Sequence, residues 1–243
     1  MKVRVKYVKS GHFKFIGHLD VMRFFQKAVK RAGLDIAYSQ GFSPHQLMSF
    51  AAPLALGVTS EGEYFDAEFN SLVSSDEFVR RFNEQMVEGM TVKDVILLPD
   101  DAKNSMSIVA ASDYHITILD KEEDTACADR KAKLLEVSGH LLEKETIEVL
   151  RKTKKNEKVE DIKNGIFKLY PDGDQLYMLL ATGSAYNLKP ELVVEALCRE
   201  TGYEYQKFDY RIHRIETYMR SAEGELVSLL ESGTRISNGN AQG

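Results

Sequence analysis

Three side chains near the N-terminus have types and spacing that suit acid–base chemistry. His18 and Asp20 lie two residues apart, and His45 follows within the stretch Ser39 to Asp66, SQGFSPHQLMSFAAPLALGVTSEGEYFD. Histidine changes charge near neutral pH, so these groups are candidates for a general base or a proton shuttle in RNA backbone cleavage. The alternative is that both histidines only hold loops by hydrogen bonds, because no further group at a fixed spacing completes a site.

A set of bases beside these groups points to binding of an anion. Four of them recur at helical spacing, namely Arg23, Lys27, Lys30 and Arg31. They share the face of an expected helix that lies opposite an apolar stripe of Met22, Phe25 and Val29. Such a face can neutralise several phosphates, and binding would then weaken steeply with salt. A solvated helix face without a ligand would give the same pattern.

The stretch GFSPHQ, which begins at Gly41, predicts a loop rich in hydrogen-bonding groups. Gly41 and Pro44 favour an unusual backbone path. Ser43, His45 and Gln46 carry polar side chains, and we expect them to act as binding contacts together with the basic helix.

Charge is distributed unevenly along the chain. Residues 1–60 carry nine Lys and Arg but only two acids, whereas the rest carries 23 bases and 35 acids, for a net charge of −5. A basic lobe on an acidic protein favours a polyanion or an acidic protein surface as partner. The alternative is that these charges are spread around the lobe and only keep it soluble.

Composition limits the class of protein. With 243 residues, 43% apolar and 28% charged, the chain has the composition of a soluble globular protein. Its two cysteines, Cys127 and Cys198, suggest a reducing cytosol and are too few for an iron–sulfur cluster. No apolar run is long enough to span a membrane, so we expect a cytoplasmic protein. Glu61 and Glu63 are too few for a metal site, and we expect no metal or cofactor in this chain.

Periodicity in the first hundred residues predicts the order strand, helix, strand, strand, helix, strand. The expected elements are strand Val3–Tyr7, whose alternating bases form an outer face, helix His18–Ala32, a short strand Ile36–Tyr38, strands Leu47–Val58 and Glu63–Phe69 joined by a turn at Gly57–Gly62, a helix from Ser75, and strand Met90–Leu98. This is the ferredoxin-like split βαβ order, which places both helices on one face of an antiparallel sheet.

The same order recurs after a polar connector at residues 100–112. Its expected elements are strand Tyr114–Ile118, a helical stretch Lys121–Leu142, strand Thr146–Arg151, a hairpin around Pro171–Asp174, a helix from Pro190 and strand Tyr203–Tyr218. We therefore predict an α+β protein of two tandem ferredoxin-like (βαββαβ) domains, at residues 1–100 and 112–220. Residues 221–243 are expected to form a mostly disordered tail.

Several short motifs resemble one known family. They are Arg4 with Tyr7-Val8-Lys9-Ser10-Gly11, Phe15-Ile16-Gly17-His18-Leu19-Asp20, Ala28-Val29-Lys30-Arg31-Ala32-Gly33-Leu34, Tyr38-Ser39-Gln40-Gly41-Phe42-Ser43-Pro44-His45, Ser49-Phe50-Ala51, and Pro53-Leu54-Ala55-Leu56-Gly57-Val58 with Ser60-Glu61-Gly62-Glu63-Tyr64. Together they resemble the radical-SAM-linked protein family of bacteria, specifically over residues 1–70 and more loosely to about residue 215. The resemblance implies a radical SAM partner, B12-binding in some members, which supplies the iron–sulfur cluster, SAM and cobalamin.

Three functions remain open from the sequence. The leading one is an accessory module, not an enzyme by itself, that presents a substrate such as tRNA or rRNA to a radical SAM partner. The second is a stand-alone RNA-processing or RNA-modifying enzyme that uses His18, His45 and Asp20. The third is a protein–protein adaptor without nucleic acid.

Overall fold

The computed structural model describes residues 1–119, 127–152 and 157–237, and the chain divides into two compact units. The first unit takes residues 1–110 together with the C-terminal residues from 216 onward, and the second takes residues 111–215. The first unit therefore contains both ends of the chain, whereas the sequence predicted domains that follow one another without interruption.

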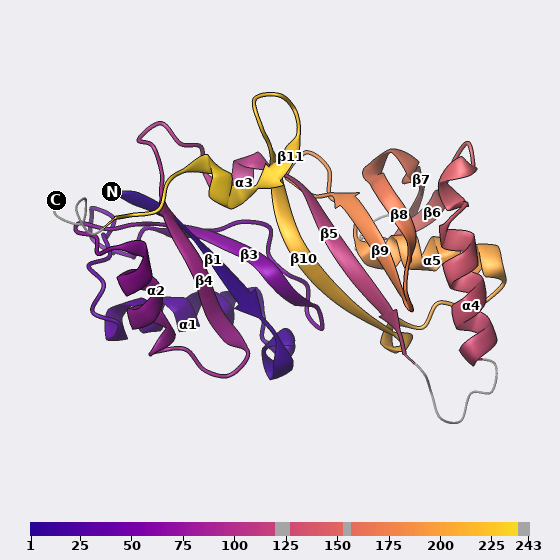
Figure 1. The fold of residues 1–243 in the computed structure, drawn as a ribbon, viewed down its shortest axis with the longest axis horizontal. Coiled ribbons are helices and arrows are strands. Elements are labelled where there is room, and N and C mark those ends of the chain that lie inside the picture. Colours follow the sequence, from indigo (N-terminus) through magenta and orange to yellow (C-terminus); the bar gives the residue numbers. More distant parts are fainter. Residues whose placement is uncertain (120–126, 153–156, 238–243) are drawn as a thin grey trace. The chain divides into compact units, whose positions relative to one another are not determined.

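The first unit has a split strand–helix order (Figure 1). Its elements are β1 (Lys2–Lys9), the 3-10 helix η1 (Gly11–Phe15), α1 (His18–Arg31), β2 (Met48–Phe50), β3 (Thr59–Glu68), α2 (Ser75–Asn83), β4 (Met90–Leu97) and α3 (Ser105–Ile108), followed after the second unit by β11 (Leu226–Ser228) and η5 (Leu229–Ser232). Strand β1 pairs antiparallel with β3 and β4, and β2 pairs antiparallel with β3. The resulting order is β4–β1–β3–β2, in which β1 and β2 run in the same direction.

The second unit repeats an α+β arrangement with an inserted hairpin. Its elements are β5 (Val109–Ile118), α4 (Cys127–Ser138), η2 (Leu141–Glu143), β6 (Glu148–Lys152), β7 (Glu157–Asp161), η3 (Lys163–Gly165), β8 (Ile166–Asp172), β9 (Gln175–Ala181), α5 (Pro190–Thr201), η4 (Lys207–Asp209) and β10 (Tyr210–Arg220). The hydrogen-bonded strand order is β4–β1–β3–β10–β5–β9–β8 in a nine-stranded sheet with β2 and β11 at its sides, and β6 and β7 form a separate pair. The predicted α+β class is confirmed.

The core of the first unit lies where β1 faces its two helices. Val3, Val5 and Tyr7 alternate toward the helices, as the period of two requires, and they are almost completely buried. The Phe25 ring of α1 lies 4.7 Å from the Tyr7 ring and 5.8 Å from the Phe82 ring of α2. Truncating one such phenylalanine typically costs about 3–5 kcal/mol, so this cluster fixes α1 on the sheet.

The opposite face of β1 is buried as well, which corrects the predicted basic outer face of this strand. Arg4 is completely buried, and its guanidinium binds the buried Asp66 of β3 through Nε to Oδ1 at 2.8 Å and Nη2 to Oδ2 at 3.0 Å. Asp66 Oδ2 also accepts the Ser105 N–H of α3, and Arg4 Nη1 donates to Ser232 Oγ of η5. One ion pair thus joins β1, β3, α3 and the C-terminal segment.

The predicted disorder of residues 221–243 was wrong for residues 221–237. Figure 1 shows this yellow segment returning to the elements of the first unit, where Thr234 and Leu97 exchange two backbone hydrogen bonds of 2.8 and 3.0 Å. Ile236 is buried in the core beside α2, and Arg235 pairs with Asp76 at 2.6 Å. Residues 238–243 lie outside the described part of the chain.

Several predicted boundaries also need correction. Only Met48–Phe50 of the expected strand Leu47–Val58 is a strand, and β3 begins at Thr59, inside the expected turn. The turn comes earlier because Gly57 has a φ of 89°, and its N–H is bonded to the Lys14 carbonyl, away from the sheet.

Two differences concern the remaining predicted strands and helices. The predicted strand Thr146–Arg151 corresponds to β6, which belongs to the separate hairpin, and Ile36–Tyr38 makes only isolated bridges. The first residues of the predicted helix Lys121–Leu142 lie outside the described residues, and α4 ends at Ser138. Among the described residues, no helix is long and apolar enough to cross a membrane.

The buried ion pair leads to a stability prediction. Asp66→Ala leaves the Arg4 charge buried without its partner, and we expect the unfolding free energy to fall by about 3–5 kcal/mol. Urea denaturation followed by circular dichroism measures this change. The control is Asp20→Ala, which removes an exposed ion pair with Arg23 and should cost less than about 1 kcal/mol. Equal losses in the two variants would contradict a structural role for the buried pair.

Candidate functional site

The loop at residues 39–45 is closed by its own end residues. Tyr38 and Gln46 form an antiparallel bridge, the Ser39 N–H donates to the His45 carbonyl at 2.8 Å, and the His45 N–H donates to Ser39 Oγ at 3.0 Å. Ser39 Oγ also lies 2.8 Å from His45 Nδ1. The His45 ring is therefore held in place, and its Nε2 remains the nitrogen that can meet a ligand.

The tip of this loop presents an aromatic ring to solvent. Gly41 has a φ of 112°, a conformation that a side chain would strain, and the chain turns here. Phe42, the next residue, is fully exposed, and Ser43 is also exposed. Ser43 was predicted as a contact from the sequence and Phe42 was not, although a large apolar side chain between Gly41 and Pro44 is a signal that could have identified it.

Gln46 positions the loop from beneath. It is only 5% exposed, and its Nε2 donates to the Gln26 carbonyl of α1 at 3.1 Å and to Tyr38 Oη at 3.4 Å. Its Oε1 is buried and has no hydrogen-bond partner in the part of the chain that the structure describes. The side chain of Gln46, predicted as a binding contact, therefore points at α1 and fixes the base of the loop against the helix.

The basic residues of α1 differ in the contacts that they make. Arg23 and Lys27 are exposed, and Arg23 makes a solvent-exposed pair with Asp20 at 3.1 Å. The Lys30 ammonium lies 5.5 Å from the centre of the Tyr38 ring, whereas Arg31 donates to the Gln85 carbonyl. Arg23, Lys27 and Lys30 follow one another at intervals of four and three residues and so share one face of α1, whereas the Arg31 guanidinium is held at the Gln85 carbonyl.

Tyr38 links this basic face to the loop. Its hydroxyl is bonded to the Lys30 ammonium and to the Gln46 amide, and these two bonds lower the pKa of Tyr38. Because Gln46 also contacts the carbonyl of Gln26, the residue before Lys27, the base of the loop adjoins the basic face. Phosphate-binding cations and a base-stacking ring are the chemistry that this arrangement offers.

The three acid–base candidates do not form one hydrogen-bonded set among the described residues. His18 begins α1, and its ring packs edge-on against Phe50 at 5.4 Å. Gln46 contacts α1 at Gln26, which is eight residues after His18, or about 12 Å along the helix axis. His18 and Asp20 therefore lie near the start of the helix, and His45 lies next to a residue that packs two turns later.

A buried lysine fixes the start of α1. Lys9 is 2% exposed, and its Nζ donates to the Ile16 carbonyl at 2.8 Å. Burial lowers the pKa of the Lys9 amine, and the negative charge of Glu63 offsets part of this shift. Lys9 thereby holds the turn between η1 and α1.

Exposed apolar side chains gather around this turn. Phe15 is 64% exposed, Leu19 61% and Leu56 57%. The Gly57 N–H bond to the Lys14 carbonyl, 2.8 Å long, places the segment of Leu56 beside that of Phe15. We call Phe15, Leu19 and Leu56 the apolar cluster. It was not predicted from the sequence, because its members come from separate segments and give no periodic signal.

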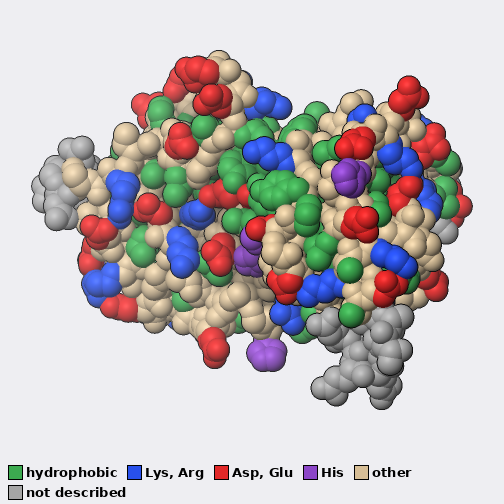
Figure 2. Space-filling view, turned by 45° about the vertical axis from the view of Figure 1, so that its right-hand side comes forward, with side chains coloured by type: hydrophobic (Ala, Val, Ile, Leu, Met, Phe, Trp, Pro, Cys, Tyr) green, Lys and Arg blue, Asp and Glu red, His purple; other side chains and the backbone are tan. Residues whose placement is uncertain are grey.

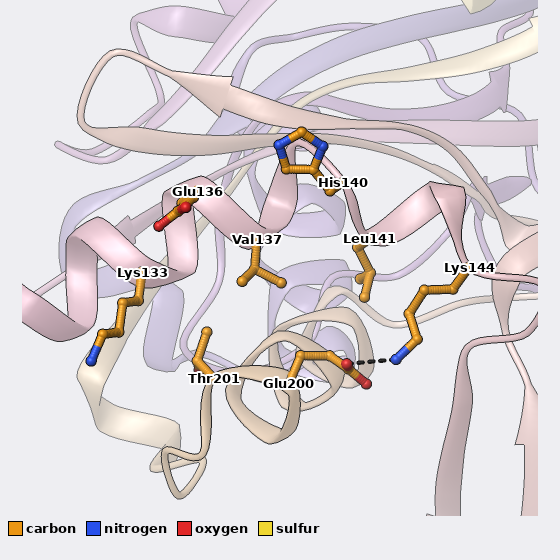
Figure 3. A pocket seen from close by; sticks show the side chains of 8 residues that line it. All are labelled: Lys133, Glu136, Val137, His140, Leu141, Lys144, Glu200 and Thr201. Carbon is orange, nitrogen blue, oxygen red and sulfur yellow. Dashed lines mark hydrogen bonds and ion pairs between the residues drawn. The ribbon is translucent and has the colours of Figure 1, made fainter.

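The second unit contains a pocket of its own, with a volume of about 470 Å³ (Figure 3). Val137 and Leu141 point into it from α4 and η2, and Thr201 points into it from the end of α5. An ion pair of Lys144 with Glu200 closes one side. Bases and acids alternate around this pocket, so its charge favours no particular class of ligand. In the described part of the chain, no group of three or more His, Cys, Asp or Glu could hold a metal ion.

Comparison with protein families gives one match, over residues 2–190, to a family described as "Uncharacterized protein conserved in bacteria (DUF2344)". Among solved structures, 23 chains match. One belongs to "Crystal Structure of a Cbf5-Nop10-Gar1 Complex", with a TM-score of 0.41 and 8% identity over 88% of this chain and 48% of that chain. The chain thus spans about half the length of that structure's chain. A comparison with curated proteins finds no match.

The buried lysine leads to a prediction about pH. Since the pKa of Lys9 is lowered in the folded chain, the unfolded chain binds more protons at this site just below the ordinary lysine pKa of about 10.4. Lys9 therefore makes stability rise with pH in that window. The unfolding free energy of the wild type minus that of Lys9→Met should increase from about pH 7.5 to 10 in urea titrations. Lys93→Met, which removes an exposed amine, is the control, and a difference that is flat or falls with pH would refute the assignment.

Proposed function

The chain belongs to the bacterial family DUF2344, and we propose that it is an accessory binding module that presents RNA, such as tRNA or rRNA, to a radical SAM enzyme in the cytoplasm. The observation that carries the proposal is the assembly of α1 with the loop at residues 39–45. Arg23 and Lys27 would contact phosphates, and Phe42 would stack on a base. Ser43 and His45 would donate or accept hydrogen bonds at the base edge.

The geometry of α1 supports phosphate binding. Arg23 and Lys30 are seven residues apart, about 10 Å on a helix, which is the axial length of about three phosphates on one strand of a duplex. Phe42 lies at the tip of a loop whose base contacts α1 and which is closed before any ligand arrives, so little ordering entropy would be lost on binding.

The distribution of charge supports a local contact set. On the face seen in Figure 2, Lys and Arg side chains are interspersed with Asp and Glu, without one broad basic area. Of the bases near the N-terminus, Arg4 and Lys9 are buried with internal partners. Arg23 and Lys27 of α1 are exposed, and they would provide the local attraction for RNA.

The fold is also part of the proposal. We infer two ferredoxin-like modules, supported by the order β4–β1–β3–β2 in the first unit and β10–β5–β9–β8 in the second. Modules of this class bind RNA in other proteins, which is an analogy of fold and not of site.

The radical SAM partner is inferred from the sequence resemblance, and the apolar cluster supports a protein contact. Three large exposed apolar side chains on two adjacent segments suit a protein interface. The partner would supply the iron–sulfur cluster, SAM and cobalamin. The same cluster favours a second candidate function, a protein–protein adaptor without nucleic acid.

The phosphate contacts lead to a prediction about salt. Arg23→Ala with Lys27→Ala should weaken RNA binding and make the slope of log K against log salt less negative by about 1.4, since each phosphate contact on a single strand contributes about 0.7. Fluorescence anisotropy with a labelled tRNA anticodon stem-loop at several salt concentrations measures the slope.

The matched control for this prediction is Arg80→Gln with Arg81→Gln. It removes two charges from α2, where both arginines pair with Glu77. If this control and the α1 variant change the slope equally, net charge alone governs binding and α1 is not the contact site.

A second prediction concerns the partner. Leu19→Glu with Leu56→Ser should weaken a complex with a radical SAM protein at least tenfold, because exposed charge on the cluster would be desolvated at the interface. Size-exclusion chromatography with light scattering and a titration measure the complex. Val87→Glu, which changes an exposed valine elsewhere in the first unit, should leave it intact. Loss of RNA binding alone in the cluster variant would assign the cluster to RNA.

A further inference from the structure

Three rings form a row across three neighbouring strands of the second unit. His115 of β5 lies directly opposite Tyr177 of β9, which in turn lies opposite Tyr170 of β8. The Tyr170 and Tyr177 rings are stacked at 4.7 Å, and the His115 ring meets Tyr177 edge-on at 5.9 Å. We call His115, Tyr177 and Tyr170 the ring row.

The ring row lies on the sheet face that points away from the helices. Its neighbours on β9, Leu176 and Met178, are completely buried, as the alternation of a strand requires. On β10, the Tyr210 hydroxyl lies 2.9 Å from Cys198 Sγ of α5, which identifies the helix-facing side. Tyr170 is 43% exposed, so solvent reaches the outer end of the row.

We propose that the ring row binds the bases of single-stranded RNA. The proposal shares its class of ligand with the function proposed above but rests on a different surface of the molecule. Aromatic side chains on a four-stranded sheet stack with unpaired bases, because every base has a flat π-face. The outer face of Tyr170 is the one that a first base would cover, and the edges of the stacked pair would meet the next.

The polar groups beside the row suit the edge of a base. His115 Nε2 lies 3.0 Å from Asp172 Oδ2, which leaves Nδ1 as the second ring nitrogen for a base. The Tyr177 hydroxyl donates to Asp113 Oδ2 at 3.1 Å, so that ring is fixed and cannot turn away. The row is therefore preorganised before RNA arrives.

Both acids and bases lie beside the row. Asp113 accepts from the Tyr177 hydroxyl, Asp172 Oδ2 lies 3.0 Å from His115 Nε2, and Asp174 pairs with Lys131 at 3.2 Å. Lys168 lies two residues before Tyr170 on β8, and Arg211 alternates with the helix-facing Tyr210, so both belong to the face of the ring row. Lys168 and Arg211 are exposed and make no ion pair within the described residues.

The experiment compares variants of the full chain on two labelled probes, a 12-nucleotide oligoadenylate RNA and the same strand in a duplex. We expect the wild type to bind the single strand more tightly, because bases in a duplex offer no free face. Tyr170→Ala should weaken single-strand binding roughly 5- to 100-fold without changing the salt slope.

Phe208→Ala is the matched control, because Phe208 is an 85% exposed aromatic residue of the same unit outside the row. If Tyr170→Ala binds like Phe208→Ala, or if the wild type prefers the duplex, the inference is overturned. If Tyr170→Ala loses RNA binding while Arg23→Ala with Lys27→Ala keeps it, the ring row is the RNA site and the proposed role of α1 is wrong. If the α1 variant loses RNA binding while Tyr170→Ala keeps it, α1 is the RNA site and the inference about the ring row is overturned. If Tyr170→Ala instead loses only a protein partner, the row is a protein contact and the inference is overturned.

Discussion

The buried pair of Arg4 and Asp66 is the constraint on which the first unit depends. Two charges removed from water are costly, and they are tolerated only when hydrogen bonds satisfy their remaining atoms. Here Ser105 and Ser232 supply such bonds, and Arg4 also donates to the Lys103 carbonyl. The partners come from distant parts of the sequence, so the first unit cannot complete this network until its C-terminal segment is present. Since a hydrophobic replacement of similar volume is often as stable, we infer that the pair favours one arrangement of these segments over others.

Helix α2 and the C-terminal segment together close the edge of the sheet at β4. On β4, the Val92 N–H and carbonyl are both bonded to the Asn83 amide, at 2.8 and 2.9 Å, and Ser75 Oγ donates to the Val95 carbonyl. The backbone N–H and carbonyl of Leu97 are both hydrogen-bonded to Thr234. A foreign strand could not add to these positions without displacing an internal bond. Partners of the first unit are therefore expected to meet side-chain surfaces, such as α1, the loop tip and the apolar cluster.

The sequence predicts well whatever depends on local periodicity. The apolar stripe and Gly33 define α1 almost to the residue, as His18–Arg31 against the expected His18–Ala32. It predicts poorly whatever depends on distant chain segments. Alternation on β1 indicates an outer face for Arg4, but α3 and η5 cover that face. A basic residue on a strand is solvated or buried according to elements more than a hundred residues away, and no local pattern contains that information.

The candidate sites show the same limit, with one exception. The inward direction of Gln46 depends on the bridge between Tyr38 and Gln46, which closes a loop whose length the sequence does not fix. Part of the ring row could have been predicted from the sequence. The turn pairs Asp172 with Gln175, and counting back along both strands places Tyr170 opposite Tyr177. Its partner His115 lies on β5, and only the sheet register of the whole unit brings it into line.

The internal contacts of the Lys and Arg side chains limit how strongly the protein can bind RNA. In the first 60 residues, Arg4, Lys9 and Arg31 have internal partners, and Lys30 lies over Tyr38. Arg23 and Lys27 are the exposed cations of α1 that contact neither Tyr38 nor Gln85. Two phosphate contacts give only a shallow dependence on salt, with a slope of about −1.4. Charge of this amount does not hold RNA tightly, so stacking on Phe42 and on the ring row would have to supply much of the affinity and would favour unpaired bases. A protein that binds RNA in this way would rely on a partner to keep the RNA in place, as expected of an accessory module.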